Sequence, residues 1–252
     1  MLRLSRSEFF DEYFSYNPGE HLSLIYPTRR GKTHLAYQCL DSAMRQNPGI
    51  STVSLMPKPR DPATTRWAQR LNLKETPEWP PKKKWPWQDD PRGYVLWPRH
   101  DPSLDATANR VQVASRLKKC LSSQYWRGNS ITFADDVHNL AVLMGLNPEL
   151  EEFWTAGGSS GAGLWSANQK PSGTMNSGSV SSFSYNAPSH LFLGKDTDER
   201  NIKRFGEIGG VDPREVEGIV RNLPLWNIDG NTISSVLYVD KRGPYLCEIL
   251  PY

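Results

Sequence analysis

The residue types that could do chemistry are concentrated in residues 21–34, where an apolar run is followed by Gly31-Lys32-Thr33. The apolar run His21–Ile25 predicts a buried strand, and the residues after Thr33 have helical spacing, so the triplet opens a helix. Backbone amides at a helix N-terminus bind phosphate oxygens, a lysine there neutralises β- and γ-phosphate charge, and a threonine hydroxyl can ligate magnesium. The pattern predicts a P-loop. Its expected nucleotide-binding residues are Thr28, Arg29, Arg30, Gly31, Lys32, Thr33 and His34, with Thr33 also a ligand of Mg²⁺.

The loop departs from the G-x-x-x-x-G-K-T pattern at its first position, where Tyr26 replaces glycine. That glycine normally relieves a tight backbone position, so we expect the tyrosine to cost loop geometry or nucleotide affinity. The alternative is that Gly31-Lys32-Thr33 is a fortuitous helix start with no ligand.

A second candidate site is the acidic pair Asp135-Asp136, which follows the apolar run Ser130–Ala134. An acid at a strand end can hold magnesium through its water shell, and a second acid can polarise the attacking water. We assign magnesium to Asp135 and the role of catalytic base to Asp136, the arrangement of a Walker B strand. Taken alone, the pair could also be a solvated turn. Aspartate is shorter than the glutamate usual at the second position, which argues against efficient hydrolysis.

A third candidate is Gln169, which follows the apolar run Leu164–Ala167. A strand inserted between the Walker A and Walker B strands would bring this amide beside the γ-phosphate. There it could sense the nucleotide state by hydrogen bonding. The alternative is an amide exposed to solvent where a strand passes into a loop.

The elements that must position these residues alternate between strand and helix. This alternation predicts an α/β fold with a mainly parallel sheet covered by helices on both faces. A C-terminal antiparallel hairpin is expected from Thr232–Val239 and Tyr245–Leu250. Helices are expected over Ser7–Tyr16, Thr33–Asn47 and Asp105–Trp126, and strands over His21–Ile25, Ile50–Met56, Gly93–Trp97, Ser130–Ala134, Leu164–Ala167 and Ser189–Gly194.

Charge is distributed unevenly along the 252 residues, although the net charge is only +3. Residues 57–127 carry 15 Lys and Arg against 7 Asp and Glu, whereas residues 129–252 carry 9 against 15. Prolines and tryptophans crowd the start of the basic part, and proline at that density disrupts helices and central strands. We expect one domain over 1–252, with an irregular basic Pro- and Trp-rich insertion at about 57–92.

Composition also bears on location. No stretch reaches the roughly 18 consecutive apolar residues that a membrane-spanning helix needs, and residues 1–11 lack the apolar core of a signal peptide. We therefore expect no membrane span and a cytoplasmic protein, in a bacterium or in a virus-infected host cell. The three cysteines, Cys39, Cys120 and Cys247, are far apart and support neither a disulfide framework nor a zinc site.

Several ordered motifs together resemble the FtsK/HerA branch of RecA-like P-loop ATPases, which includes DNA translocases and viral DNA-packaging ATPases. The resemblance covers about residues 20–225. The motifs that carry it are Pro27-Thr28, Gly31-Lys32-Thr33-His34-Leu35, Lys58-Pro59-Arg60-Asp61, Phe133-Ala134-Asp135-Asp136-Val137-His138, Ala167-Asn168-Gln169-Lys170-Pro171-Ser172, and Ser189–Gly194 followed by Asp196–Arg200.

The resemblance implies roles for particular residues. Lys32 and Thr33 correspond to the phosphate and magnesium residues, Asp136 to the residue acting on water, and Gln169 to the sensor. Arg200 stands where related motors carry an arginine that reaches a neighbouring subunit's nucleotide, which implies a homo-oligomeric ring, commonly a hexamer. The glycine- and serine-rich stretch 157–161 stands where relatives often carry an arginine, so no arginine is expected from that loop.

The leading hypothesis is an ATP-binding and hydrolysing motor that translocates or packages DNA. The basic insertion supports a DNA partner, because the lysines at 82–84 could neutralise phosphate and Trp79, Trp85 and Trp87 could stack on bases. The insertion could equally be a solvated loop whose tryptophans pack on prolines. The alternative function is a nucleotide-dependent switch or scaffold with weak ATPase activity. A small-molecule kinase is disfavoured because no lid or acceptor motif is visible.

Overall fold

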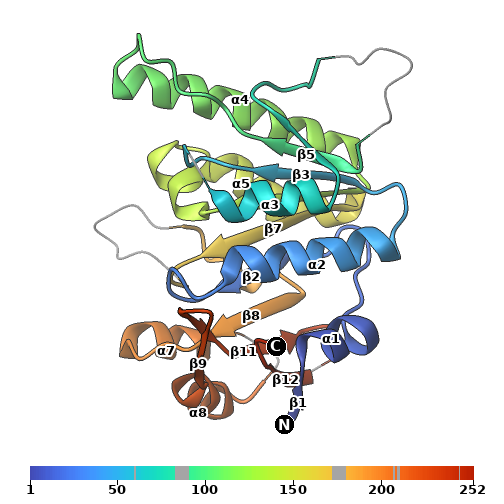
Figure 1. Ribbon diagram of the computed structural model, residues 1–252, viewed down its shortest axis with the longest axis vertical. Coiled ribbons are helices and arrows are strands. Elements are labelled where there is room, and N and C mark those ends of the chain that lie inside the picture. Colours follow the sequence, from blue (N-terminus) through green and yellow to red (C-terminus); the bar gives the residue numbers. More distant parts are fainter. Residues whose placement is uncertain (60, 83–90, 172–179, 207, 209–210, 244) are drawn as a thin grey trace.

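A computed structural model describes residues 1–252 except 60, 83–90, 172–179, 207, 209–210 and 244. Its centre is a ten-stranded sheet with the order β1-β12-β11-β8-β2-β7-β6-β3-β5-β4 (Figure 1). The strands are β1 (Leu2–Leu4), β2 (Leu22–Ile25), β3 (Ser51–Leu55), β4 (Leu73–Thr76), β5 (Gly93–Leu96), β6 (Ser130–Asp135), β7 (Ala162–Asn168), β8 (His190–Gly194), β11 (Val236–Asp240) and β12 (Tyr245–Ile249).

The seven strands from β8 to β4 run parallel to one another. All residues of β2, β6, β7 and β8 are buried, as expected for strands covered on both faces. β7 lies between β2 and β6, which is the strand order that the predicted role of Gln169 requires. The predicted α/β fold, with its mainly parallel sheet, is confirmed.

Helices cover both faces of the sheet. The α-helices are α1 (Arg6–Glu8), α2 (Lys32–Gln46), α3 (Pro62–Arg70), α4 (Ala106–Arg127), α5 (Asn147–Ala156), α6 (Phe183–Asn186), α7 (Glu199–Gly206) and α8 (Pro213–Asn222), with π-helical turns η1 (Phe9–Tyr13) and η2 (Asn139–Leu143) and a 3₁₀ turn η3 (Gly157–Ser160). Apolar residues of α2 and α3 pack in one cluster with Leu24 and Phe133, whereas those of α4 and α5 pack with Ala134 on the opposite face. Residues of α7 and α8 also pack on that second face, against Leu193.

The N-terminal segment is less regular than the single helix expected over Ser7–Tyr16. Ser5, not Ser7, begins the helix, through a capping box in which Ser5 and Glu8 exchange side-chain and backbone hydrogen bonds. The α-helix lasts only to Glu8 and continues as the π-helical turn η1. Phe9 in that turn is fully buried and contacts Phe192 and Tyr238 edge to face, so packing on the sheet determines the local backbone.

The stretch 57–92 was expected to be irregular, and this expectation is wrong for its first half. Asp61 caps α3 by accepting hydrogen bonds from the backbone N–H groups of Ala63 and Thr64, and Pro62 occupies the first helical turn, where proline is tolerated. β4 then extends the sheet beyond β5 as a parallel edge strand. Most of the Lys- and Trp-rich tip, residues 83–90, lies outside the described residues.

The C-terminal part contains two hairpins. The expected one is present as the antiparallel pair β11 and β12, but the strand predicted over Thr232–Val239 is divided at Ser235. Its first half is β10 (Asn231–Ser234), which pairs in a separate two-stranded sheet with β9 (Leu225–Ile228). The β9–β10 turn is formed by Asp229 and Gly230, both with positive φ, of 52° and 75°. Among the described residues, no helix is long and apolar enough to cross a membrane.

Candidate nucleotide site at the loop between β2 and α2

The loop after β2 ends at a helix N-terminus that is open to an anion. Gly31 is the N-cap of α2, with φ of 94°, a left-handed conformation that favours glycine. No side chain in the described part of the chain caps this end of the 15-residue helix. The first backbone N–H groups of α2 therefore lack the acceptor that most helix starts receive from Ser, Thr, Asp or Asn, and the helix dipole favours a negative charge there.

Lys32 folds back onto the loop. Its Nζ donates hydrogen bonds to the carbonyl oxygens of Pro27, at 2.8 Å, and of Tyr26, and lies over the Tyr26 ring at 5.1 Å from the centroid. Burial lowers the pKa of Lys32 to about 8, with the Asp135 carboxylate opposing part of that effect. The ammonium group is thus a largely desolvated cation held at the mouth of the loop.

Tyr26 does not strain the backbone, contrary to the cost in loop geometry expected from the missing glycine. Its φ is not positive, and the left-handed residues of the loop are Arg29, with φ of 58°, and Gly31. The Tyr26 side chain is fully buried and packs against Gly194 of β8, so closely that a Cβ on Gly194 would lie 2.3 Å from the tyrosine Cβ. A bulky residue fits because the neighbouring strand supplies a glycine.

Asp135 ends β6 on the same face of the sheet as α2. It is 2% exposed, and its Oδ2 accepts a hydrogen bond from Lys58 Nζ at 2.7 Å. Although burial of the ammonium acts in the opposite direction, the Asp135 carboxylate raises the pKa of Lys58. Lys58 was identified from the sequence only as part of a resemblance, and no role was given to it. The sequence signal for Lys58 is its position after β3. Because β3 pairs in parallel with β6, residues that follow the two strands lie close together.

Asp136 begins the turn after β6, with φ of 65°, a conformation that aspartate tolerates better than most residues. Its Oδ1 accepts a long hydrogen bond, 3.3 Å, from the backbone N–H of Asn139, so the carboxylate also caps the following helical turn. It remains half-buried, and its negative charge, like that of Asp135, partly opposes the lowering of the Lys32 pKa by burial. Lys32, Asp135 and Asp136 therefore lie within one electrostatic cluster.

The other predicted residues surround this cluster less closely. Thr28, Arg29, Gln169 and Arg200 are exposed, whereas Arg30, Gly31 and Thr33 are half-buried. Gln169 directly follows β7, in which Trp165 and Ala167 are buried beside α2. Arg200 lies in the first turn of α7. That helix lies beyond the ends of the strands toward which β7 and β8 point, where α2 also begins (Figure 1). No hydrogen bond or ion pair joins Gln169 or Arg200 to Lys32, Asp135 or Asp136 within the described part of the chain.

His34 faces a different neighbour from the one expected. Its Nδ1 accepts a hydrogen bond from Trp67 Nε1 at 3.0 Å, and the two rings meet edge to face. Partial burial, together with the positive charges of Arg6, Arg70 and Arg66, lowers the pKa of His34 to about 4. At neutral pH the imidazole is therefore uncharged, and because Nδ1 accepts from Trp67, its ring proton is on Nε2.

The residues present fit a magnesium ion that is held mainly by phosphate oxygens. Among the described residues, no group of three or more His, Cys, Asp or Glu side chains could hold a metal ion by itself. Magnesium at nucleotide sites needs only one or two protein oxygens besides phosphates and waters. The buried carboxylate of Asp135 at the strand end and the hydroxyl of Thr33 at the helix start form such a sparse donor set.

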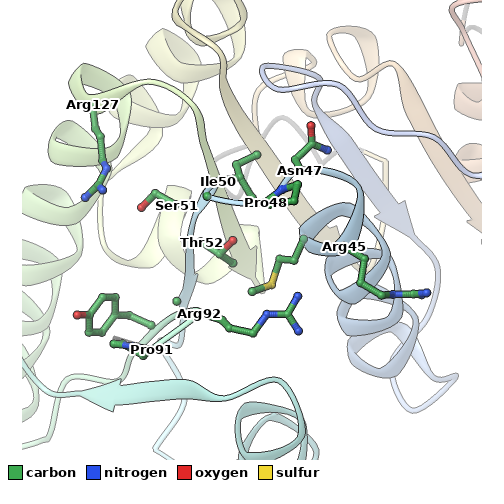
Figure 2. Close-up of a pocket in the computed structure, with 13 residues that line it drawn as sticks. Arg45, Asn47, Pro48, Ile50, Ser51, Thr52, Pro91, Arg92 and Arg127 are labelled. Atoms are coloured by element: carbon green, nitrogen blue, oxygen red, sulfur yellow. The ribbon is translucent and has the colours of Figure 1, made fainter. Parts of the chain in front are cut away.

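A separate cavity of about 760 Å³ lies at the other ends of the strands, where β3 and β5 begin (Figure 2). Arg45 at the end of α2, Arg92 before β5 and Arg127 at the end of α4 line it, and no acidic side chain of the described residues does. Arg45 and Arg92 both reach Asp41, at 3.5 and 3.8 Å. Arg127 has no ion-pair partner among the residues that the structure describes. This cavity is not part of the loop site.

Solved structures of viral packaging NTPases share this architecture. The genome-packaging NTPase B204 from Sulfolobus turreted icosahedral virus 2, in complex with sulfate, matches with a TM-score of 0.61 at 11% identity, over 94% of this chain and 98% of that chain. Its complex with AMP gives a TM-score of 0.58 at 10% identity, over 94% and 100%. The DNA-packaging ATPase B204 from Sulfolobus Turreted Icosahedral Virus gives 0.54 at 11% identity, over 94% of this chain and 100% of that chain.

This chain has the fold of the B204 packaging NTPases. The fold that the motif resemblance implied is therefore confirmed across almost the whole chain. No protein-family model matches the sequence, and no curated protein matches it.

Proposed function

We propose that this protein binds ATP at the loop between β2 and α2 and hydrolyses it. The observation that carries the proposal is the electrostatic cluster of Lys32, Asp135 and Asp136, beside the uncapped N-terminus of α2. Phosphoryl transfer to water uses positive charge on the phosphates and a carboxylate near the water. Here a desolvated lysine, free helix amides and two carboxylates meet at the carboxyl ends of parallel strands.

Each residue has a distinct task in this proposal. The amides from Gly31 onward and the Lys32 ammonium, turned away from the loop carbonyls, bind the β- and γ-phosphates. Asp136 accepts a proton from the attacking water while the water oxygen bonds to the γ-phosphorus. The bond between the γ-phosphorus and the β,γ-bridging oxygen breaks, and ADP leaves. Gln169 senses the γ-phosphate, and Arg200 stabilises the charge of the transition state in a neighbouring subunit. Thr33 and Asp135 would hold Mg²⁺, which supplies positive charge to the phosphate oxygens.

We further propose that hydrolysis moves or packages DNA through an oligomeric ring, commonly a hexamer, in the cytoplasm. The support is the B204 fold, whose solved examples are a genome-packaging NTPase and a DNA-packaging ATPase, together with the basic middle of this chain. DNA binding through phosphates depends on salt, and the slope of log affinity against log salt concentration becomes shallower by about 0.9 for each phosphate that the protein no longer neutralises. Arg45, Arg92 and Arg127 line the cavity where β3 and β5 begin, and replacing them by alanine tests whether that cavity contributes to the slope.

The experiment is ATP hydrolysis measured with and without duplex or single-stranded DNA. We expect DNA to stimulate turnover in the wild type. Lys32→Ala should abolish turnover with the fold retained, because it removes the cation that faces the phosphates. Lys74→Ala, at an exposed lysine of β4, is the matched control and should behave as the wild type. Unchanged turnover in Lys32→Ala would show that the loop is not the hydrolytic site.

A nucleotide-dependent switch or scaffold with weak ATPase activity is the second candidate. The Lys58–Asp135 ion pair favours it, because an ammonium group already neutralises the carboxylate assigned to magnesium. A switch would bind ATP tightly yet turn over slowly whether or not DNA is present, so the same assay separates the two functions.

A further inference from the structure

Arg6 is a buried cation to which the described residues offer no carboxylate partner. Its side chain belongs to the first residue of α1, and the residue is only 7% exposed. The guanidinium donates a hydrogen bond from Nη1 to Gln38 Oε1 on α2 at 3.0 Å. No ion pair to Arg6 occurs among the residues that the structure describes, and burial lowers the pKa of its guanidinium.

This guanidinium lies beside the phosphate-binding loop. A Cβ added to Gly31 would lie 3.9 Å from Arg6 Nη2 and 3.4 Å from the Ile233 side chain of β10. The positive charge also reaches the first turn of α2, where it contributes to the lowered pKa of His34. Arg6 therefore approaches the loop from outside the motif, from a segment far away in the sequence.

An arginine cannot shed its proton at physiological pH, so burying it without an anion is costly. Five N–H donors are available in a planar fork suited to phosphate, and within the described part of the chain Gln38 accepts from only one of the guanidinium nitrogens. The uncapped start of α2 and the Lys32 ammonium attract negative charge to the same place. The missing partner of Arg6 is then an anion that arrives at this loop.

We propose that Arg6 binds the phosphate chain of the nucleotide, as a site residue that the P-loop motif does not include. This inference rests on the proposed function, because it needs a nucleotide at the loop. The backbone of the N-terminal segment holds the side chain in place, since the Arg6 N–H donates to the Tyr252 carbonyl at 2.9 Å and β1 pairs with β12. Pairing of β1 with β12 therefore positions Arg6, so loss of that pairing would lower nucleotide affinity.

The test measures the affinity of a non-hydrolysable ATP analogue and of adenosine, by calorimetry, in Arg6→Gln, Arg6→Met and Arg6→Lys variants. The matched control is Arg3→Gln, because Arg3 lies in the same segment but is exposed and pairs with Glu248. We expect Arg6→Gln and Arg6→Met to weaken analogue binding about 10- to 100-fold, the loss of hydrogen bonds to a charged group. Arg6→Lys should lose less analogue affinity. The affinity for adenosine should be the same in all variants, and Arg3→Gln should bind the analogue as tightly as the wild type.

A second readout, the melting temperature without nucleotide, separates phosphate binding from a purely structural role. We expect Arg6→Met to melt at or above the wild-type temperature, because it removes a buried charge that only the ligand neutralises. Analogue affinity at the wild-type level in Arg6→Met would overturn the inference. So would a lowered melting temperature in both Arg6→Met and Arg6→Gln with equal losses for analogue and adenosine. If the wild type binds no analogue, the proposed function fails first, and this inference fails with it.

Discussion

The charged side chains Asp135 at the end of β6 and Lys32 at the start of α2 are each held by a partner. Asp135 is neutralised by Lys58, and Lys32 is held by backbone carbonyls of its own loop. With a pKa of about 8, Lys32 is still protonated at neutral pH although it is largely desolvated. Part of the desolvation cost of binding a phosphate has therefore been met before a nucleotide arrives, which favours tight binding.

The Asp136 carboxylate is expected to matter for hydrolysis more than for binding. Asp136→Asn keeps a side chain that tolerates the left-handed backbone and can still accept the Asn139 N–H, but it cannot take a proton from water. We expect nucleotide affinity close to the wild type and turnover slower by about 10²–10⁴-fold. Single-turnover hydrolysis and equilibrium binding measure the two effects separately. An equal loss of both would assign Asp136 to the metal site instead.

Tyr26 is expected to stabilise the loop through packing. Tyr26→Gly removes a fully buried ring between α2 and β8, and such truncations cost about 3–5 kcal/mol in the free energy of unfolding. Nucleotide affinity should fall with it, because Lys32 loses the surface on which it rests. Tyr26→Phe, which removes only a hydroxyl that has no hydrogen-bond partner among the described residues, is the control and should be nearly neutral. Tighter nucleotide binding by Tyr26→Gly would restore the view that the tyrosine distorts the loop.

At the level of residues, sequence could predict those that belong to a contiguous motif. Gly31, Lys32 and Thr33 are recognisable because helix-start chemistry requires them at adjacent positions. Lys58 and Arg6 reach the same site from other segments, and only the strand order and the packing of α1 on α2 bring them there.

At the level of elements, a polar network joins the segment before β2 to the antiparallel strand β11. Glu20 accepts hydrogen bonds from the backbone N–H and side chain of Asn17 and from Arg242, and it contacts His190 Nε2 at 3.1 Å. Although partial burial acts in the opposite direction, the hydrogen bonds from His190 and Asn17 lower the pKa of Glu20 to about 2. Tyr238 of β11 also contacts His190.

This network predicts a dependence of stability on acid. A carboxyl whose pKa is lower in the folded than in the unfolded state stabilises the fold above its unfolded value, near 4.5, and that contribution is lost as the pH falls toward 2. Glu20→Gln should lower the free energy of unfolding at pH 7 by about 1–3 kcal/mol and flatten its decline between pH 5 and pH 2. Denaturant titrations across this range measure it. Glu12→Gln, at an exposed glutamate, is the control, and an unchanged pH profile in Glu20→Gln would contradict the role of the network.

The elements that sequence could not predict are those that depend on neighbours. β4 is a short edge strand with two exposed residues, and the prolines around it obscured its pattern. The strand predicted over Thr232–Val239 is continuous by composition, but β11 pairs with β8 while β10 folds back onto β9. The Asp229-Gly230 turn was a local signal for that hairpin, whereas the change of sheet at Ser235 had none.

At the level of the whole molecule, Arg200 is the residue whose proposed role needs a second subunit. It is exposed, and Asp196, the acidic residue four positions earlier in the sequence, accepts hydrogen bonds from Asn201 and from the Asp198 backbone instead. We expect Arg200→Ala to lower turnover by about 10³–10⁵-fold with little loss of nucleotide binding. Arg214→Ala, at another exposed arginine, is the control.

Mixing the inactive variants tests whether Arg200 acts across the subunit boundary. Rings that contain both Arg200→Ala and Lys32→Ala subunits hold some interfaces with an intact loop and an intact arginine, so partial ATPase activity should return. Full activity of Arg200→Ala alone would end this proposal. Continued inactivity in rings shown to be mixed would count against action across the boundary.

Nucleotide binding at the loop between β2 and α2 is tested by a crystal structure with a non-hydrolysable ATP analogue and Mg²⁺. We predict density for the phosphate chain at Gly31–Thr33, with the Lys32 ammonium moved from the carbonyls of Tyr26 and Pro27 onto that chain. An analogue bound elsewhere, for example in the arginine-lined cavity where β3 and β5 begin, with Lys32 still on the loop carbonyls, would show that this loop is not the nucleotide site.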